Sequence, residues 1–155
     1  MNTSAVRHLS FYPFVQALAR SKARFSLEAA ADDLSSCELV WWKRSVPEKK
    51  QTAPMHISIS DRCTDQWVAE VSFQEEAHYI KYGFKLTDQA GKTAWFNAYG
   101  FHAKETPEGS FEILQINETD VLRIPAWSQG CIYYQIFPER CAKSGMVQGN
   151  FDDWD

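Results

Sequence analysis

The chain has no long apolar run and no excess of basic residues. No stretch of its 155 residues approaches the ~20 consecutive apolar residues of a membrane-spanning helix. The 16 basic side chains are outnumbered by 20 acidic ones, and the formal net charge of −4 gives no electrostatic case for a nucleic-acid partner. The composition therefore argues against both a membrane protein and a nucleic-acid-binding protein.

Closely spaced cysteines and a secretory leader are also lacking. The four cysteines, Cys37, Cys63, Cys131 and Cys141, show no CxxC spacing and have no histidine at metal-ligand distance in the sequence. The first residues show neither a lysine-rich start nor a small-residue cleavage site. We therefore expect a cytoplasmic protein with reduced thiols, no metal site and no cofactor.

The length favours a single domain and excludes a complete (β/α)₈ barrel. At 155 residues the chain is close to the commonest size of a single domain and can bury a core of its own. A (β/α)₈ barrel needs roughly 250 residues. Two full domains are therefore not expected.

Long amphipathic helical patterns are missing, and alternation with a period of two residues takes their place. Four alternating rows predict strands with one inward apolar face, in residues 25–29, 55–59, 67–73 and 80–86. In the second row, Met55, Ile57 and Ile59 are expected to point inward. Weaker patterns, apolar on both faces, predict further strands in residues 14–18, 37–42, 92–99 and 111–116.

Turn residues separate these strands. Residues 88–91 and 106–109 each end in glycine and predict turns. Residues 29–36 are expected to hold a helical turn, because Asp32 and Asp33 would favour its N-terminal end. About 7–8 short strands with no helix between them predict an all-β fold, an antiparallel β-sandwich.

Adjacent aromatic residues occur in two of the weaker strands. Trp41 and Trp42 must face opposite sides of a strand, so the two rings cannot share one core. Trp95 and Phe96 pose the same problem, and Tyr99 follows them closely. We expect one ring of the Trp41 and Trp42 pair to meet a sugar, a partner domain or another chain.

Two C-terminal segments carry a specific family resemblance. Residues 125–127 read Pro-Ala-Trp, and residues 132–140 read Ile-Tyr-Tyr-Gln-Ile-Phe-Pro-Glu-Arg. Together they resemble the junction in neopullulanases, cyclomaltodextrinases and maltogenic amylases of glycoside hydrolase family 13. At that junction the N-terminal domain passes into the first strand of the catalytic barrel. Residues 79–88 resemble the central strand of that N-terminal domain, and residues 99–101 and 116–121 resemble further motifs of it.

The resemblance implies a domain organisation. Residues 1–124 would form an immunoglobulin-like β-sandwich, also classed as a family 34 carbohydrate-binding module. Residues 125–131 would be a linker, and residues 132–155 would be the start of a truncated barrel. In the family the catalytic carboxylates lie on later barrel strands, so no catalytic residue is assigned and the chain alone is expected to be inactive. The resemblance leaves room for calcium in the full-length enzyme, but Cys141 and the residues after it do not match the family's ligand motif.

The same resemblance makes exposed aromatic rings candidates for carbohydrate contact, since sugars stack their apolar faces on planar rings. The candidates are Trp41, Trp42, Trp95 and Tyr99. Residues 43–51 resemble a segment that in the family reaches over the active site of a partner subunit. They lack the tyrosine that the family carries there.

The leading hypothesis is an N-terminal domain of a cytoplasmic α-glucan hydrolase that acts on cyclodextrins, pullulan or maltooligosaccharides. The domain would serve homodimerisation and shaping of the active site in its own catalytic barrel or in that of a partner. Two alternatives stay open. One is a free-standing module that binds an α-glucan oligosaccharide or cyclodextrin. The other is a purely structural domain whose aromatic face only packs against the barrel.

Overall fold

The computed structural model describes residues 1–121, 123–128, 130–132 and 134–137. The chain divides into two compact units, Met1–Leu122 and Arg123–Asp155. From sequence alone the first domain ends at residue 124, and that boundary stays a prediction.

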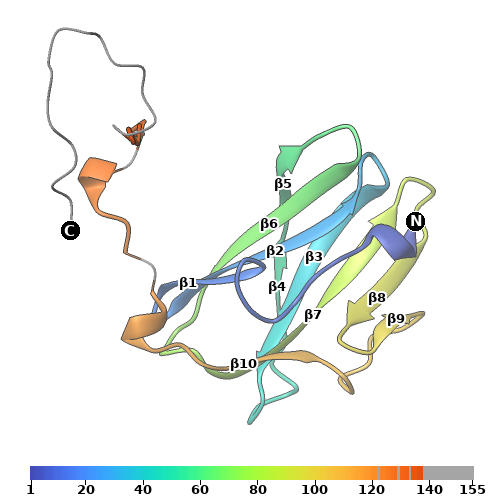
Figure 1. Ribbon diagram of the computed structural model, residues 1–155. Coiled ribbons are helices and arrows are strands. Elements are labelled where there is room, and N and C mark those ends of the chain that lie inside the picture. Colours follow the sequence, from blue (N-terminus) through green and yellow to red (C-terminus); the bar gives the residue numbers. More distant parts are fainter. Residues whose placement is uncertain (122, 129, 133, 138–155) are drawn as a thin grey trace, which may run out of the picture. The chain divides into compact units, whose positions relative to one another are not determined.

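The described part of the first unit consists of short strands joined by tight turns, with two short 3-10 helices (Figure 1). The 3-10 helices are η1 (Thr3–Ala5) and η2 (Glu118–Asp120). The strands are β1 (Val15–Ala19), β2 (Lys22–Ala30), β3 (Leu34–Lys43), β4 (Gln51–Pro54), β5 (His56–Ser60), β6 (Thr64–Ser72), β7 (His78–Asp88), β8 (Thr93–Asn97), β9 (Gly100–His102) and β10 (Phe111–Gln115).

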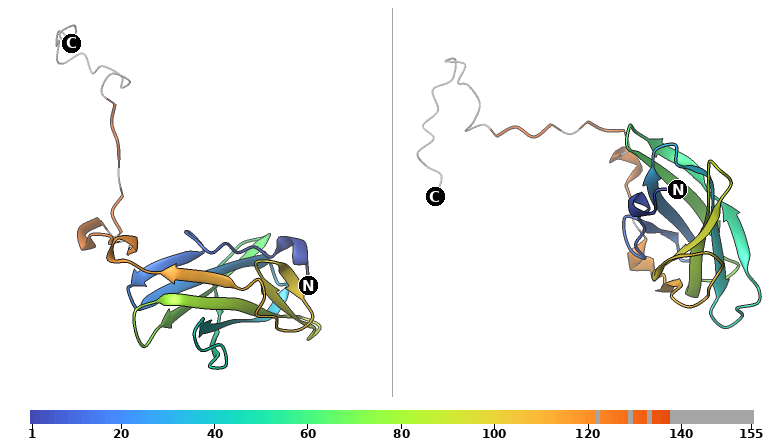
Figure 2. Two further views of the ribbon diagram at one scale, coloured as in Figure 1. Left: turned by 90° about the horizontal axis from the view of Figure 1, so that it is seen from below. Right: turned by 90° about the vertical axis from the view of Figure 1, so that its right-hand side faces the viewer.

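These strands form two antiparallel sheets that pack face to face (Figure 2). The four-stranded sheet has the order β1-β2-β6-β5. The six-stranded sheet has the order β4-β3-β7-β8-β9, and β10 also pairs with β7. The predicted all-β antiparallel sandwich is confirmed.

The core lies between the two sheets and is built from the predicted alternating rows. Three of these rows are Phe25, Leu27 and Ala29 of β2; Trp67, Ala69 and Val71 of β6; and Ile80, Tyr82, Phe84 and Leu86 of β7. All of these side chains are buried. On the other face of β7, Lys85 points outward and pairs with Glu38 of β3 at 3.0 Å. The alternation therefore predicts the inner faces of these three strands correctly.

The second predicted row is wrong at Ile57 and Ile59. Met55 is buried, but Ile59 is 62% exposed and Ile57 is 45% exposed. The pairing of β5 with β6 shifts register between Ile57 and Ile59, where one extra residue enters the ladder. Such a bulge reverses the facing of the side chains that follow it, which explains Ile59. Ile57 precedes the bulge and lies opposite Trp67, and its exposure follows from the position of β5 at the edge of the sheet.

The helical turn predicted in residues 29–36 is also wrong. Residues 31–33 form a tight turn between β2 and β3. Asp32 adopts a left-handed conformation with φ of 58°, and its amide donates to Asp65 Oδ2 at 2.9 Å. Asp tolerates this conformation better than most residues, so the pair of aspartates marks a tight turn that leads from one sheet to the other rather than a helix start.

His8 is a polar residue that is buried beside the core. His8 lies among the rings of Phe14, Phe84 and Phe111, at centroid distances of 5.7, 4.6 and 4.7 Å. Its Nδ1 is 2.7 Å from Ser26 O, and its Nε2 is 3.0 Å from the Tyr82 hydroxyl. Burial lowers the pKa of His8 to about 4, because removal from water disfavours the charged imidazolium. His8 is therefore a neutral core residue near pH 7.

The described residues of the second unit include a 3-10 helix, η3 (Ala126–Ser128). Residues 132 and 134–137, which belong to the predicted barrel strand, form no strand, and their side chains are exposed. The rest of that segment, with Cys141, lies outside the described residues. A barrel start at this point stays a prediction. No helix among the described residues is long and apolar enough to cross a membrane.

Candidate functional site

The adjacent rings of Trp41 and Trp42 face opposite sides of β3, as predicted, and both are buried. Trp41 belongs to the main core, where it makes an edge contact with Phe73 at 5.2 Å. Trp42 is only 1% exposed and packs with Val40 and Trp95 in a second apolar cluster on the outer face of the six-stranded sheet. We call Val40, Trp42 and Trp95 the outer cluster.

The outer cluster is closed by the chain itself. The ring of Trp95 lies against Gly83 of β7, where a Cβ atom would approach the Trp95 ring to 2.4 Å. Lys50 covers Trp42, with its ammonium 4.9 Å from the ring centroid, and also pairs with Glu105. The indole N–H of Trp95 donates to Thr106 O at 3.2 Å. The outside partner expected for one tryptophan is thus supplied by the chain's own side chains and loops.

Tyr99 behaves differently from the three tryptophans. Its ring is 78% exposed and rests on Gly109, which adopts a φ of 72° in the predicted turn. The Tyr99 amide donates to Asn97 Oδ1 at 2.9 Å, and Asn97 Nδ2 donates to Glu108 O at 2.9 Å. Of the four candidate rings, only Tyr99 is open to solvent. Carbohydrate contact at Trp41, Trp42, Trp95 and Tyr99 stays a prediction.

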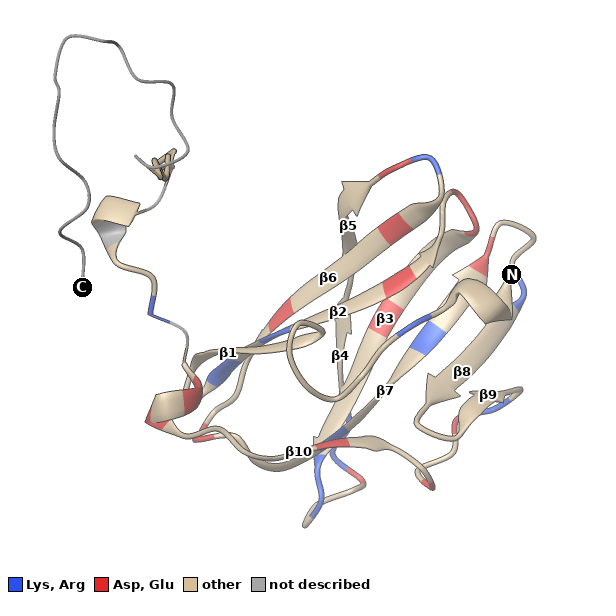
Figure 3. Ribbon diagram, in the orientation of Figure 1, with Lys and Arg blue, Asp and Glu red and all other residues tan. Residues whose placement is uncertain are grey.

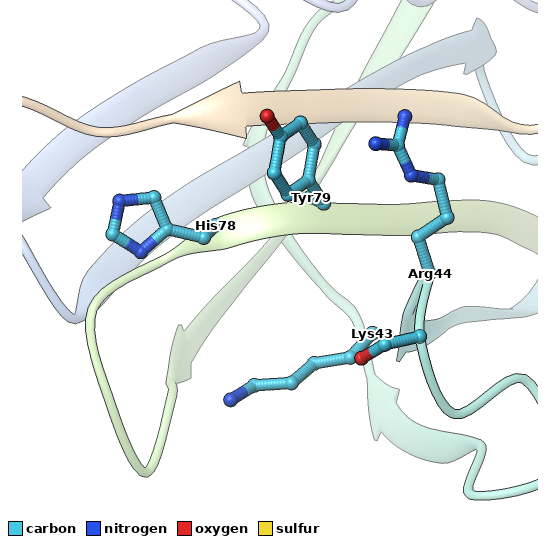
Figure 4. A pocket seen from close by; sticks show the side chains of 5 residues that line it. Lys43, Arg44, His78 and Tyr79 are labelled. Atoms are coloured by element: carbon cyan, nitrogen blue, oxygen red, sulfur yellow. The ribbon is translucent and has the colours of Figure 1, made fainter.

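A pocket of about 330 Å³ lies where the end of β3 meets the start of β7. We call it the Tyr79 pocket, and its lining consists of Lys43, Arg44, Ser45, His78 and Tyr79. Pairing of Lys43 with Ile80 in the sheet brings these two segments together. Figure 4 shows Arg44 beside the Tyr79 ring, His78 farther along β7, and Lys43 extending beneath.

Tyr79 holds an unusual backbone conformation for a strand residue. Its φ is 49°, in the left-handed region that bulky side chains rarely adopt. Its carbonyl accepts a hydrogen bond from the Arg44 amide at 2.8 Å, which ties β7 to the loop after β3. The strand alternation breaks here, since His78 and Tyr79 are both exposed before Ile80 becomes fully buried.

The cations of the pocket are paired with nearby carboxylates. Lys43 Nζ lies 2.5 Å from Glu75 Oε2, and Arg44 Nη1 lies 3.2 Å from Glu112 Oε1. The hydrogen bond from Lys43 lowers the pKa of Glu75. In Figure 3 blue and red segments lie together at this end of the six-stranded sheet. The local charge of the pocket is therefore close to balanced.

The guanidinium of Arg44 also covers one side of the Tyr79 ring, at 4.0 Å from its centroid. The tyrosine nevertheless stays 49% exposed. Within the described part of the chain, neither the Ser45 hydroxyl nor the His78 imidazole makes a side-chain hydrogen bond. The pocket thus offers a free aromatic surface and uncommitted polar groups side by side.

A second, smaller hollow of about 190 Å³ lies beside the same loop. Its apolar lining comes from Trp41, Phe73 and Val46, and its polar lining includes Lys43 and Gln74. Because Trp41 and Phe73 are almost fully buried, the hollow exposes little ring area for a ligand. Sequence reasoning singled out Trp41 for this region and missed Tyr79.

The described residues contain no cluster of three or more His, Cys, Asp or Glu side chains placed to hold a metal ion. The acidic residues of two loops take part in structural contacts instead. Glu76 pairs with Arg20 at 2.6 Å, and Asp61 accepts hydrogen bonds from the amides of Cys63 and Thr64, both at 2.8 Å.

Two antiparallel sheets around an aromatic core, with loops gathered at the sandwich ends, define an immunoglobulin-like β-sandwich. The chain belongs to the family of alpha amylase N-terminal ig-like domains, whose family model matches residues 1–117. The family resemblance drawn from the sequence is confirmed.

Several relatives are similar over most of the chain. It is 28% identical to neopullulanase 2 of Thermoactinomyces vulgaris over 144 residues, which cover 92% of this chain and 24% of that protein. It is 38% identical over 91 residues to a cyclomaltodextrinase of a Bacillus species, covering 57% of this chain and 16% of the relative. A solved cyclomaltodextrinase structure matches with a TM-score of 0.78 and 28% identity, over 89% of this chain and 24% of that one. The chain thus spans about a quarter of the length of these relatives in its longest matches.

Proposed function

We propose that this domain assists an α-glucan hydrolase in which it is followed by a catalytic barrel. The observation that carries the proposal is the family match over residues 1–117, in a chain that spans 24% of a neopullulanase. The names of the relatives, neopullulanase and cyclomaltodextrinase, support pullulan and cyclodextrins as the substrate class of the whole protein.

The domain's part in this activity is assembly and shaping of the active site in a homodimer. The loop between β3 and β4 supports this role because backbone hydrogen bonds within it and to Tyr79 of β7, together with ion pairs, hold it in place. Arg44 joins it to Glu112 of β10, and Lys50 joins it to the loop that contains Glu105. A loop held in this way can present a fixed surface to a second subunit without a large loss of conformational entropy. A cytoplasmic location stays a prediction from the sequence.

The experiment compares the full-length protein with a version that lacks residues 1–122. We expect the full-length protein to sediment as a dimer and to prefer γ-cyclodextrin over soluble starch. Removal of the domain should give a monomer with a reduced preference for cyclodextrin. Equal sedimentation and equal substrate ratios in the two proteins would refute the proposal.

The isolated 155-residue chain supplies a second test. Incubated with γ-cyclodextrin or pullulan, it should release no reducing sugar. Measurable release by the purified chain would contradict the assignment of catalysis to another part of the protein.

A further inference from the structure

We propose that the Tyr79 pocket binds a short segment of neutral α-glucan, with Tyr79 as the stacking platform. The site differs from the four rings that the sequence singles out. The choice of α-glucan as ligand rests on the proposed function, whereas the location rests on the pocket itself.

The size and the ring of the pocket suit a sugar. Its volume of about 330 Å³ lies at the lower end of the range of small-molecule sites, roughly 300 to 1,000 Å³. Tyr79 is half-exposed although Arg44 covers part of its ring. An open aromatic surface inside a hollow is where the apolar face of a glucosyl ring gains most from leaving water.

The polar lining suits a polyhydroxyl ligand, which needs both donors and acceptors. The Ser45 hydroxyl donates and accepts, and a neutral His78 ring has one donor and one acceptor nitrogen. Lys43 and Arg44 use only part of their N–H groups in their ion pairs, since an ammonium has three donors and a guanidinium five. The lining can therefore bond several hydroxyl groups without breaking a pair.

Charge balance favours a neutral ligand over an anion. Glu75 and Glu112 lie within 2.5 and 3.2 Å of the two permanent cations of the pocket. A phosphate or carboxylate in the pocket would be repelled by these two carboxylates or would have to displace them. A neutral sugar meets neither penalty.

Backbone strain at Tyr79 points to a role for its ring. A non-glycine residue held in the left-handed region destabilises the folded chain, and such residues cluster at ligand sites. Asparagine tolerates this conformation far better than tyrosine. A tyrosine at φ of 49° therefore carries a stability cost that a purely structural position has no need of.

The test measures the affinity of the 155-residue chain for maltotriose by isothermal titration calorimetry. We expect millimolar binding by the wild type, because a small ligand has little surface to bury. Tyr79→Asn should weaken it by about tenfold, and Tyr79→Phe, which keeps the ring, by less than about threefold. The unfolding midpoint of Tyr79→Asn should equal or exceed that of the wild type, which separates loss of the ring from misfolding.

Two comparisons make the location and the ligand class refutable. Tyr99→Asn removes the other exposed tyrosine and should leave the affinity unchanged; equal weakening by Tyr99→Asn and Tyr79→Asn would overturn the location. Inorganic phosphate at ten times the maltotriose concentration should not compete, and competition would show an anion site instead. No maltotriose binding by the wild type up to about 50 mM would overturn the inference. That result would leave the dimer assembly of the full-length protein, measured by sedimentation, as a separate question.

Discussion

The outer cluster and the Tyr79 pocket are two aromatic features of one sheet with opposite characters. In the outer cluster Trp42 and Trp95 are covered by Lys50, by loop backbone and by each other, with Gly83 leaving room for the indole. In the Tyr79 pocket the ring is half-exposed, and its residue holds a strained backbone conformation. A surplus of aromatic residues on one sheet can therefore serve packing at one place and be available for binding at another.

The largest difference should come from truncation of the outer cluster. Trp42→Ala removes a fully buried indole, and substitutions of this kind cost about 3 to 5 kcal/mol of unfolding free energy. Denaturant unfolding monitored by circular dichroism measures the change. Affinity for maltotriose, measured without denaturant, where the variant is still folded, should stay within about twofold of the wild type. A small stability loss together with a large affinity loss would reverse the roles of the two features.

The pH dependence of the unfolding free energy tests whether His8, another buried side chain, is neutral in the folded chain. Because its folded pKa is about 4 and its ordinary value is 6.5, the unfolded chain takes up a proton between these values before the folded chain does. Stability is therefore complete above pH 6.5 and falls by about 3 kcal/mol as the pH drops to 4, at 1.36 kcal/mol for each pKa unit. His8→Gln should remove most of this slope, although its stability at pH 7 will be lower. Equal slopes in both proteins between pH 6.5 and 4 would show that other groups carry the effect.

Gly83→Ala probes the close contact inside the outer cluster. The added Cβ would lie 2.4 Å from Cζ2 of Trp95, and the indole must shift. Overpacking of this kind costs about 1 to 3 kcal/mol. Gly91→Ala is a contrasting variant, since no atom lies within 4 Å of its added Cβ and the strain comes only from its φ of 78°. The near-ultraviolet circular dichroism of the tryptophans should change in Gly83→Ala and not in Gly91→Ala.

The smallest stability effect should come from Glu75→Gln, which releases Lys43 from its exposed ion pair. Exposed pairs contribute little to folding, so we expect no resolvable change in the unfolding midpoint. The free ammonium should instead make maltotriose binding sensitive to added phosphate. Insensitivity to phosphate in this variant would show that Glu75 does not control the charge of the pocket.

The sequence predicts the buried faces of the strands better than the edge strands and the exposed surface. Rows such as Phe25, Leu27 and Ala29 follow from alternation, because a shift of one residue would turn all of these apolar side chains to the solvent. Alternation fails at Ile59, where a bulge on an edge strand reverses the facing of the side chain. Bulges and edge positions depend on how strands pair across the sheet, and that pairing is not encoded in local spacing.

The candidate site shows the same limit. Trp41 and Trp42 stand out in the sequence as adjacent rings. Whether the second face is covered depends on Trp95, which is distant in the chain, and on how the loop after β3 places Lys50. The Tyr79 pocket depends on a left-handed residue inside a strand and on the pairing of Lys43 with Ile80. Neither leaves a recognisable pattern in a single sequence.

The most direct test maps the amide chemical shifts of the ¹⁵N-labelled 155-residue chain during titration with maltotriose. We expect shifts confined to the Tyr79 pocket, led by the amides of Ser45, His78 and Tyr79, with little change at Trp42 and Trp95. Shifts centred on the outer cluster or on Tyr99, with none at Tyr79, would contradict it.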